Sequence, residues 1–215
     1  MSPTERLLAD AASLGVALTE RDAVRLFALL DELAHWNRTY NLTAVTTRAG
    51  MVTHHLLDSL AIHPDLRGER VADVGTGAGF PGLPLALVNP ARHFTLIDSV
   101  GKKVRFVAHA VRTLGLGNVE ALQVRAESLI PAQPFDTVTA RAFAPLPKLL
   151  TAASRLCTPA GQVLAMKGKW PQEELAALPS PWRLAGGRQI AVPGLAEARC
   201  VLVLRQDAAA APSSP

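Results

Sequence analysis

VADVGTGAGFPGLPLALVNP, residues 71–90, places four glycines and two prolines between a strand-like apolar run and a helix-like apolar run. Gly75, Gly77 and Gly79 permit the positive φ of a sharp turn, and they lack the Cβ atoms that would hold a ligand away from the backbone. The first amides of the following helix have no partner within it, and Pro81 is compatible with its first turn. The stretch predicts a strand, a ligand-binding loop and a helix. A tight turn without a ligand is the alternative.

From residue 69 onward, short strand patterns alternate with helical patterns. The strand patterns are ERVADVG, HFTLID, NVEALQV, FDTVTARA, GQVLAMKG and AEARCVLVLRQ. The helical patterns are PGLPLALV, KKVRFVAHAVRTLG and PLPKLLTAASRL, with a short turn at RAESL. Such alternation indicates the α/β class, with a mostly parallel sheet covered by helices on both faces.

The first third of the chain is predicted to be helical instead, because apolar residues recur there at helical spacing. The predicted caps and stops are Thr4 and Gly15 for the first helix, Thr19 with Asp22 for the second, and Thr53 and Pro64 for the third. We therefore expect a helical extension, residues 1–65, packed on an α/β core, residues 66–206. The patternless residues 207–215 are expected to be disordered.

Composition argues against a membrane or secreted protein. No apolar run approaches the roughly 18 to 20 residues of a membrane-spanning helix. Glu5, Arg6 and Asp10 interrupt the N-terminal apolar residues, so no secretory signal is expected. Cys157 and Cys200 lack CxxC spacing, and we interpret them as reduced structural thiols of a cytoplasmic protein.

The net charge of +4 is unevenly distributed, with −3 in residues 1–65 and +7 in the remainder. A basic excess in one part of a chain suits a polyanionic partner such as RNA. Lys167 and Lys169 follow the fifth predicted strand, on the edge where ligand loops gather. With Arg199 they are candidates for phosphate binding; solubility is the alternative.

Two carboxylates narrow the identity of the expected ligand. Asp98 ends the second predicted strand, 19 residues after Gly79, where an acid can accept both hydroxyls of a ribose. Asp73 lies two residues before Gly75, where it would repel a pyrophosphate. This acid, and glycines at every second position, favour S-adenosylmethionine over a dinucleotide. The alternative for Asp73 is hydrogen bonding to the amides of the loop itself.

The chain resembles the RsmG (GidB) family of bacterial 16S rRNA guanine-N7 methyltransferases. The matching stretches are HWNRTYNLTAV, HHLLDSLAI, VADVGTGAGFPGLPLA, LIDSVGKKVRFV, VRAESL, TARAFAPLPKLL and AMKGK, in order between residues 35 and 169. The resemblance implies a class I S-adenosylmethionine-dependent methyltransferase fold, Rossmann-like, with a mostly parallel seven-stranded sheet and an N-terminal helical extension.

The resemblance also implies an activity and a set of cofactor contacts. The activity is methyl transfer from S-adenosylmethionine to N7 of a guanine in the 530 loop, on 16S rRNA within the small ribosomal subunit or its assembly intermediate. The implied contacts are Gly75, Phe80, Ala126, Glu127 and Arg141. Glu127 could instead be a solvated carboxylate at a helix start. Arg141 could hold the cofactor carboxylate, an RNA phosphate or a surface carboxylate.

Guanine N7 carries a lone pair and no proton, so its methylation needs positioning rather than a general base. We accordingly assign no catalytic acid or base, expect no metal, and expect a cytoplasmic monomer. We expect His54 and His55 to lie on a helix face rather than in a metal site. We expect Trp36 to pack between the extension and the core. The competing interpretations are a methyltransferase for another RNA, a small molecule or a protein, a nicotinamide-dependent oxidoreductase, and an RNA-binding module without catalysis.

Overall fold

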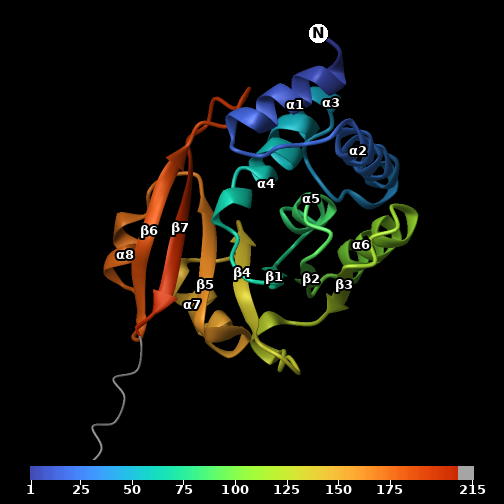
Figure 1. Ribbon diagram of the computed structural model, residues 1–215. Coiled ribbons are helices and arrows are strands. Elements are labelled where there is room, and N and C mark those ends of the chain that lie inside the picture. Colours follow the sequence, from blue (N-terminus) through green and yellow to red (C-terminus); the bar gives the residue numbers. More distant parts are fainter. Residues whose placement is uncertain (208–215) are drawn as a thin grey trace, which may run out of the picture.

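In the computed structural model, which describes residues 1–207, the chain opens with helices and continues as an α/β sheet (Figure 1). The opening elements are α1 (Pro3–Ser13), α2 (Glu20–Tyr40), α3 (Arg48–Met51), the π-helix η1 (Val52–Leu57), α4 (Asp58–Leu60) and the 3₁₀ turn η2 (His63–Asp65). The strands are β1 (Arg70–Val74), β2 (His93–Asp98), β3 (Val119–Gln123), β4 (Phe135–Arg141), β5 (Cys157–Lys167), β6 (Trp182–Ile190) and β7 (Arg199–Gln206). The remaining helices are α5 (Gly82–Leu87), α6 (Gly101–Thr113), η3 (Ala126–Ser128), α7 (Leu146–Leu156) and α8 (Gln172–Ala176).

The seven strands form one sheet in the order β3-β2-β1-β4-β5-β7-β6. Strands β1 to β5 run parallel to one another, whereas β7 is antiparallel to both β5 and β6. The mostly parallel seven-stranded sheet is therefore confirmed. The carboxyl ends of β1, β2 and β4 meet at one edge, where ligands of open α/β sheets bind.

Helices cover both faces of the sheet. α5 and α6 pack on one face with α2 outside them, and α7 packs on the other (Figure 1). One apolar core runs without interruption from α1 and α2 through α5 and α6 to the sheet; Leu26, Leu30 and Phe106 in it are fully buried. Each such leucine contributes roughly 1.5 to 3 kcal/mol of burial free energy. The first helices are therefore joined to the sheet by a shared core.

The capping residues differ in part from the prediction. Ser2, not Thr4, caps α1: its hydroxyl accepts from the Glu5 amide at 3.2 Å while the Glu5 carboxylate accepts from the Ser2 amide at 2.6 Å. The capping box of Thr19 and Asp22 is confirmed. The third helical segment begins at Arg48, capped by Thr47, so the prediction that Thr53 starts it was wrong.

Other element boundaries also differ from the prediction. Pro64 lies within η2, after α4 has ended at Leu60. Strand β6 and helix α8 were not predicted individually. Asp207 was assigned to a disordered tail, yet its amide donates to the Pro181 carbonyl at 2.8 Å and its carboxylate pairs with Arg183 at 2.7 Å. The rest of that predicted tail, residues 208–215, lies outside the described residues.

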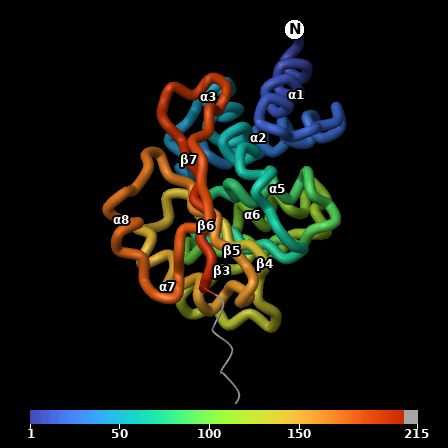
Figure 2. Tube along the Cα trace, turned by 60° about the vertical axis from the view of Figure 1, so that its left-hand side comes forward, coloured from blue at the N-terminus to red at the C-terminus, as the bar shows by residue number. Residues whose placement is uncertain are grey.

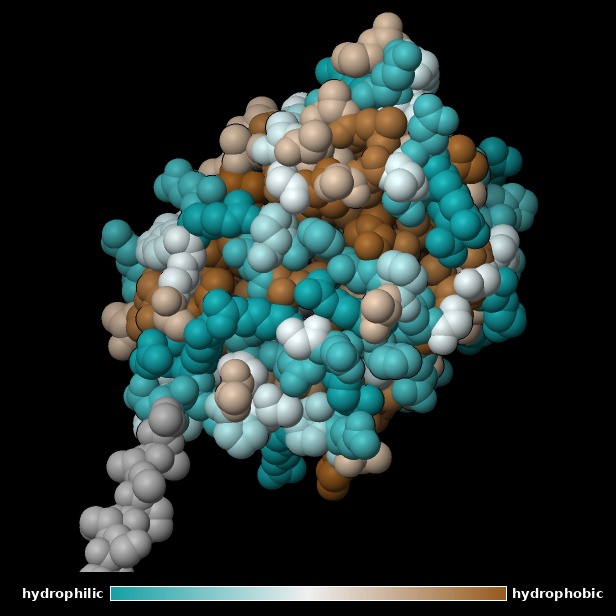
Figure 3. Space-filling model, in the orientation of Figure 1, coloured by the Kyte–Doolittle hydropathy of each residue, from teal (hydrophilic) through white to brown (hydrophobic). Residues whose placement is uncertain are grey.

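The surface seen in the orientation of Figure 1 has a more apolar part and a more hydrophilic part. Apolar residues show in its upper half, over the first helices, and hydrophilic residues gather in its lower half (Figure 3). The loop between β6 and β7 reaches the first helices near α3 (Figure 2), where Pro193 and Gly194 share a groove with Thr53. Within residues 1–207 no helix combines the length and the apolarity needed to cross a bilayer.

Candidate functional site

The glycine loop joins β1 to α5 at the carboxyl edge of the sheet. Gly75, Gly77 and Gly79 have φ values of +68°, +62° and +87°, as their sequence pattern predicts. The amides of Gly75 and Thr76 both donate to the carbonyl of Ile97, at 2.8 and 3.0 Å, which ties the loop to the end of β2. A Cβ on Gly77 would meet only the Gly75 carbonyl oxygen, at 4.0 Å. At Gly77 the loop therefore presents bare backbone to open space, whereas Gly75 and Gly79 are packed against Phe143 and Leu83.

Asp73 lies beneath this loop and is fully buried. Its Oδ2 accepts from the Thr76 hydroxyl at 2.6 Å and from the Gly82 amide at 2.8 Å, and its Oδ1 accepts from the Thr139 hydroxyl at 3.2 Å. Burial raises the pKa of Asp73 to about 6, against the lowering effect of these hydrogen bonds. Asp73 lines neither of the two cavities described below, and it supports the loop from beneath, which agrees with the alternative of hydrogen bonding to the loop itself.

Asp98 stands at the end of β2 and faces the loop. Its Oδ2 accepts from the Gly77 amide at 2.9 Å, its Oδ1 accepts from the Val100 amide at 2.8 Å, and Lys103 Nζ lies 3.8 Å from Oδ2. Each carboxylate oxygen can accept two hydrogen bonds. The amides therefore fix the carboxylate while leaving acceptor capacity for a pair of ligand hydroxyls.

Two adjoining cavities open along this edge of the sheet, of about 590 and 290 Å³. They share Gly75, Lys103 and Ala142. The smaller is lined by Asp98, Ala126 and Glu127, among others. The larger is lined by Gly77, Phe80, Arg141, Lys167 and Arg199, among others. The structure thus brings together most of the residues that the sequence selected, in two adjoining compartments.

Part of the larger cavity is built by the first 65 residues, which sequence reasoning did not assign to the site. Its wall includes Leu42, Thr43, Val45, His54, His55 and Asp58. Asn37 shapes this wall: its Oδ1 accepts from the amides of Leu42 and Thr43 at 2.6 and 2.9 Å, and its Nδ2 donates to the Thr43 carbonyl at 3.0 Å. The available signal was the polar residues within HWNRTYNLTAV and HHLLDSLAI.

Asp58 is the centre of the polar contacts in this cavity. It is 2% exposed. Its Oδ2 accepts from Arg141 Nη1 at 2.9 Å and its Oδ1 accepts from Arg199 Nε at 3.1 Å. Arg141 Nη1 also donates to the His54 carbonyl at 2.6 Å, and its guanidinium lies 5.9 Å from the centre of the Phe80 ring. Arg141 and Arg199, predicted separately, are therefore joined through one carboxylate.

His55 packs against the floor of the same cavity. Its ring stacks on Phe80, with centroids 4.7 Å apart, and its Nε2 lies 2.9 Å from the Thr43 hydroxyl. Burial, reinforced by Arg141, lowers the pKa of His55 to about 4, so the imidazole is neutral at neutral pH. No group of three or more potential ligands for a metal ion occurs within residues 1–207.

The two candidate lysines differ in their surroundings. Lys167 Nζ pairs with Glu174 of α8 at 2.8 Å and donates to the Ala144 carbonyl at 3.2 Å. The pairing with Lys167 and a hydrogen bond from the Leu146 amide lower the pKa of Glu174, although burial opposes them. Lys169 is exposed and lines neither cavity. Trp36 packs on Phe106, with ring centroids 5.7 Å apart, as predicted.

Comparison with known proteins gives consistent matches. The family model described as GidB, rRNA small subunit methyltransferase G, matches residues 23–203. The ribosomal RNA small subunit methyltransferase G of Saccharophagus degradans is 44% identical over 199 residues, which span 93% of this chain and 89% of the relative. The protein of that name from Escherichia fergusonii is 42% identical over 201 residues, 94% of this chain and 96% of the relative.

Solved structures agree in fold. The O-methyltransferase TomG of Streptomyces achromogenes, in complex with SAM, superposes with a TM-score of 0.58 at 20% identity, covering 96% of this chain and 100% of that chain. A SAM-dependent methyltransferase from Aquifex aeolicus gives 0.54 at 22% identity, covering 72% and 92% of the two chains. These likenesses confirm the Rossmann-like fold of class I methyltransferases, with additional helices at the N-terminus.

Proposed function

This chain belongs to the GidB family, rRNA small subunit methyltransferase G, and on that premise we propose that it methylates N7 of a guanine in the 530 loop of 16S rRNA, with S-adenosylmethionine as methyl donor. The observation that carries the proposal is the pair of adjoining cavities around the glycine loop. One compartment suits a nucleoside, and the other is a larger chamber lined by cations.

The smaller cavity fits the adenosine part of this cofactor. Asp98 is fixed by two amides and keeps acceptor capacity for the ribose hydroxyls. Glu127 follows β3 on the rim of the cavity, where its carboxylate can accept from the adenine amine. Asp73 is buried below the loop, so its contribution is the shape of the loop rather than a contact with the bound molecule.

The larger cavity suits a base that needs no proton removed. When bound, S-adenosylmethionine would supply the electrophilic methyl group, and guanine N7 already has a free lone pair. Asp58, a carboxylate that could have served as a base, is occupied by two arginines. His55 is packed on Phe80, and its pKa, lowered to about 4, makes it a weak proton acceptor. The residues of this cavity are therefore suited to orienting the guanine and excluding water. A mechanism that works by positioning requires no more of them.

RNA is preferred over a small molecule because of the family match and the charge of the sheet domain. Residues 66–215 carry a net charge of +7, whereas residues 1–65 carry −3. A polyanion gains from such a basic excess through release of its counterions, whereas a neutral small molecule does not. We further propose that the protein acts as a monomer in the cytoplasm, where small ribosomal subunits assemble, on the subunit or its assembly intermediate.

Asp98→Ala should weaken S-adenosylmethionine binding by about 10- to 100-fold, because the hydrogen bonds between ribose hydroxyls and an ionised acceptor are lost. Some of the loss will come from the Gly77 amide, which then loses its partner. Isothermal titration calorimetry measures the affinity, and circular dichroism checks the fold. Asp98→Asn retains acceptors on one side only, so an intermediate affinity is expected. Wild-type affinity in Asp98→Ala would show that Asp98 does not hold the ribose.

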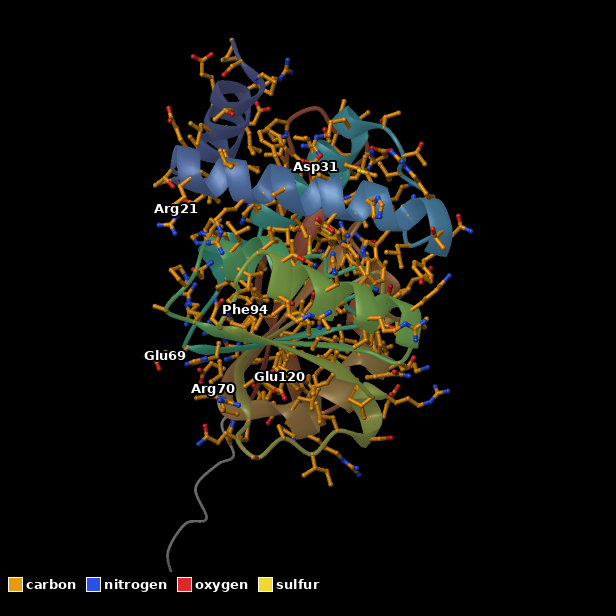
Figure 4. All side chains as sticks on the ribbon, turned by 90° about the vertical axis from the view of Figure 1, so that its right-hand side faces the viewer. Arg21, Asp31, Glu69, Arg70, Phe94 and Glu120 are labelled. Carbon is orange, nitrogen blue, oxygen red and sulfur yellow. The ribbon has the colours of Figure 1, made fainter. Side chains whose placement is uncertain are left out.

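Lys169→Ala should lower RNA affinity and flatten its salt dependence by about one unit of log Kd against log salt, as expected for one lost phosphate contact. Lys167→Ala should flatten it less, because Glu174 already compensates the charge of Lys167. Arg21→Ala is the control, since this exposed arginine lies at the amino-end side of the strands with Glu69 and Arg70 (Figure 4). Equal slopes in Lys169→Ala and wild type would remove Lys169 from the RNA surface.

Methyl transfer itself tests the function. Purified protein and methyl-labelled S-adenosylmethionine are incubated with small subunits, large subunits and naked 16S rRNA, all from a strain lacking this gene. We expect label in rRNA of the small subunit and none in the large subunit. Label in ribosomal protein, or in both subunits equally, would contradict the proposed substrate. The comparison of naked rRNA with subunits shows which form is accepted.

A further inference from the structure

The charges that line the larger cavity are almost balanced. Lys103 lies 3.8 Å from Asp98 and Lys167 lies 2.8 Å from Glu174, so each has its own carboxylate. Arg141 and Arg199 instead share one carboxylate, Asp58. Among the described residues at this cavity, one positive charge is therefore left uncompensated, and it belongs to the two arginines. The geometry points to a site for a single anionic group there.

We propose that Asp58, from the N-terminal helices, is a positioning residue that aims Arg141 at the carboxylate of S-adenosylmethionine. This proposal rests on the proposed function and deepens it. The Asp58 side chain is 4% exposed, whereas those of Arg141 and Arg199 are each 22% exposed. The acid is thus enclosed behind the arginines, and the guanidiniums keep surface toward the cavity. A guanidinium held in one orientation can present its remaining N–H groups to a carboxylate as a pair.

Each of the other contacts restricts the orientation of Arg141 further. Its Nη1 donates to both the Asp58 carboxylate and the His54 carbonyl, and its Cζ lies 5.9 Å from the centre of the Phe80 ring. Its remaining donors are not engaged by any hydrogen bond within residues 1–207, so they are free for a ligand. Arg199 engages the other oxygen of Asp58, which prevents the carboxylate from rotating away. A residue of the first 65 therefore controls a contact made by strand β4.

Two physical effects of Asp58→Asn have opposite signs, and this makes the variant informative. Loss of the negative charge alone raises the local positive charge and should tighten binding of an anion. Loss of position should weaken it, because an amide offers one oxygen to two arginines and turns an N–H₂ toward one of them. If Asp58 acts by positioning, affinity falls; if it merely compensates charge, affinity rises.

The test compares two ligands on full-length protein by calorimetry: S-adenosylmethionine, and its decarboxylated form, which lacks the carboxylate but keeps the adenosine and the sulfonium. Wild type should prefer the carboxylated ligand by about tenfold, the scale of one charge-assisted hydrogen bond. Asp58→Asn should lose this preference by weakening only the carboxylated ligand. Asp58→Asn combined with Arg141→Gln should weaken it no further than Arg141→Gln alone, since both act on one contact.

Asp65→Asn is the matched control. Asp65 lies in η2, shortly after α4, and pairs at 2.9 Å with Arg188 of β6, away from both cavities. It should lose a comparable ion pair and keep wild-type ligand preference. Unchanged or tighter binding of S-adenosylmethionine by Asp58→Asn would overturn the proposal. Equal weakening of both ligands, or the same weakening in Asp65→Asn, would overturn it too.

The outcome is separable from that of the proposed function, because no RNA is present. A wild type that prefers the carboxylated ligand but methylates no rRNA would refute the function and leave the positioning role supported. A wild type that binds neither ligand would refute both. If Asp58→Asn fails to fold, Arg141→Gln serves alone: a ligand preference equal to that of wild type in that variant would overturn the proposal.

Discussion

Gly77→Leu is expected to weaken S-adenosylmethionine binding by more than about 100-fold while leaving the protein folded. Gly77 lines the larger cavity, and its missing Cβ faces open space, with only the Gly75 carbonyl within reach, at 4.0 Å. A leucine side chain would therefore grow into the volume that the ligand needs. The strain of an L-residue at φ +62° adds a stability cost of about 1 to 2 kcal/mol.

The chain supplies a control for that strain. Gly115 has φ +60° and no atom within 4 Å of a Cβ placed on it, and it lies in the turn after α6, outside both site cavities. Gly115→Leu should shift the melting temperature about as much as Gly77→Leu and leave ligand affinity unchanged. Calorimetry and thermal melts on both variants check this. Similar affinities in the two variants would mean that the loop does not approach the ligand.

Asp73→Ala is expected to destabilise the protein by about 3 kcal/mol and to abolish cofactor binding. The change strands the Thr76 hydroxyl and the Gly82 amide, two buried donors, and each costs about 1 to 3 kcal/mol when unpaired. Relief from burying a carboxylate offsets part of this cost. Because both donors belong to the loop or its helix, the loop should lose its shape. Urea unfolding and calorimetry measure the two effects.

Asp73→Asn separates charge from hydrogen bonding. The amide can still accept from Thr76 and Gly82, so fold and binding should largely survive. Because the pKa of Asp73 is raised to about 6 from 3.8, the folded state binds the proton more tightly than the unfolded state. Wild-type stability should therefore fall as pH rises from about 4 to 6 through this group, and then level off. Asp73→Asn lacks this titrating carboxyl group, so its free energy of unfolding relative to that of wild type should rise over the same pH interval. A constant difference across that pH range would contradict the assignment.

The strand–loop–helix unit at residues 71–88 could be predicted because its signals are local. Glycines at alternate positions specify positive φ, and apolar runs on both sides specify a buried strand and a buried helix. Asp98 was found for the same reason, since it lies at a fixed distance from that loop. These features depend on neighbours in sequence rather than on the rest of the fold.

Strand β6 escaped prediction because its pattern is irregular. Gly186 and Gly187 interrupt it, the register against β7 shifts between Leu184 and Gly186, and much of the strand is exposed. The direction of the Asp73 side chain was undecided for a different reason. A residue near the end of a strand can face a ligand or the loop above it, and only its hydrogen-bond partners and the cavity walls in the fold distinguish the two.

Asp58 was not predicted as a site residue because the residues that it pairs with are distant in the chain. Arg141 lies 83 residues away and Arg199 lies 141 residues away. In the sequence, Asp58 is one polar residue within the apolar segment HHLLDSLAI, where a solvent-exposed helix position would look the same. Only the docking of the first helices against β4 and β7 reveals that one carboxylate joins two predicted site residues.

Methylation at N7 of one guanine can be located on the rRNA by chemical mapping. Small subunits from a strain lacking this gene are treated with protein and methyl-labelled S-adenosylmethionine. The rRNA is then cleaved chemically at 7-methylguanine and the cuts are located by primer extension. We expect one new cut, in the 530 loop, with wild type and none with Gly77→Leu. Label incorporation without a cut there, or cuts at other guanines, would contradict this expectation.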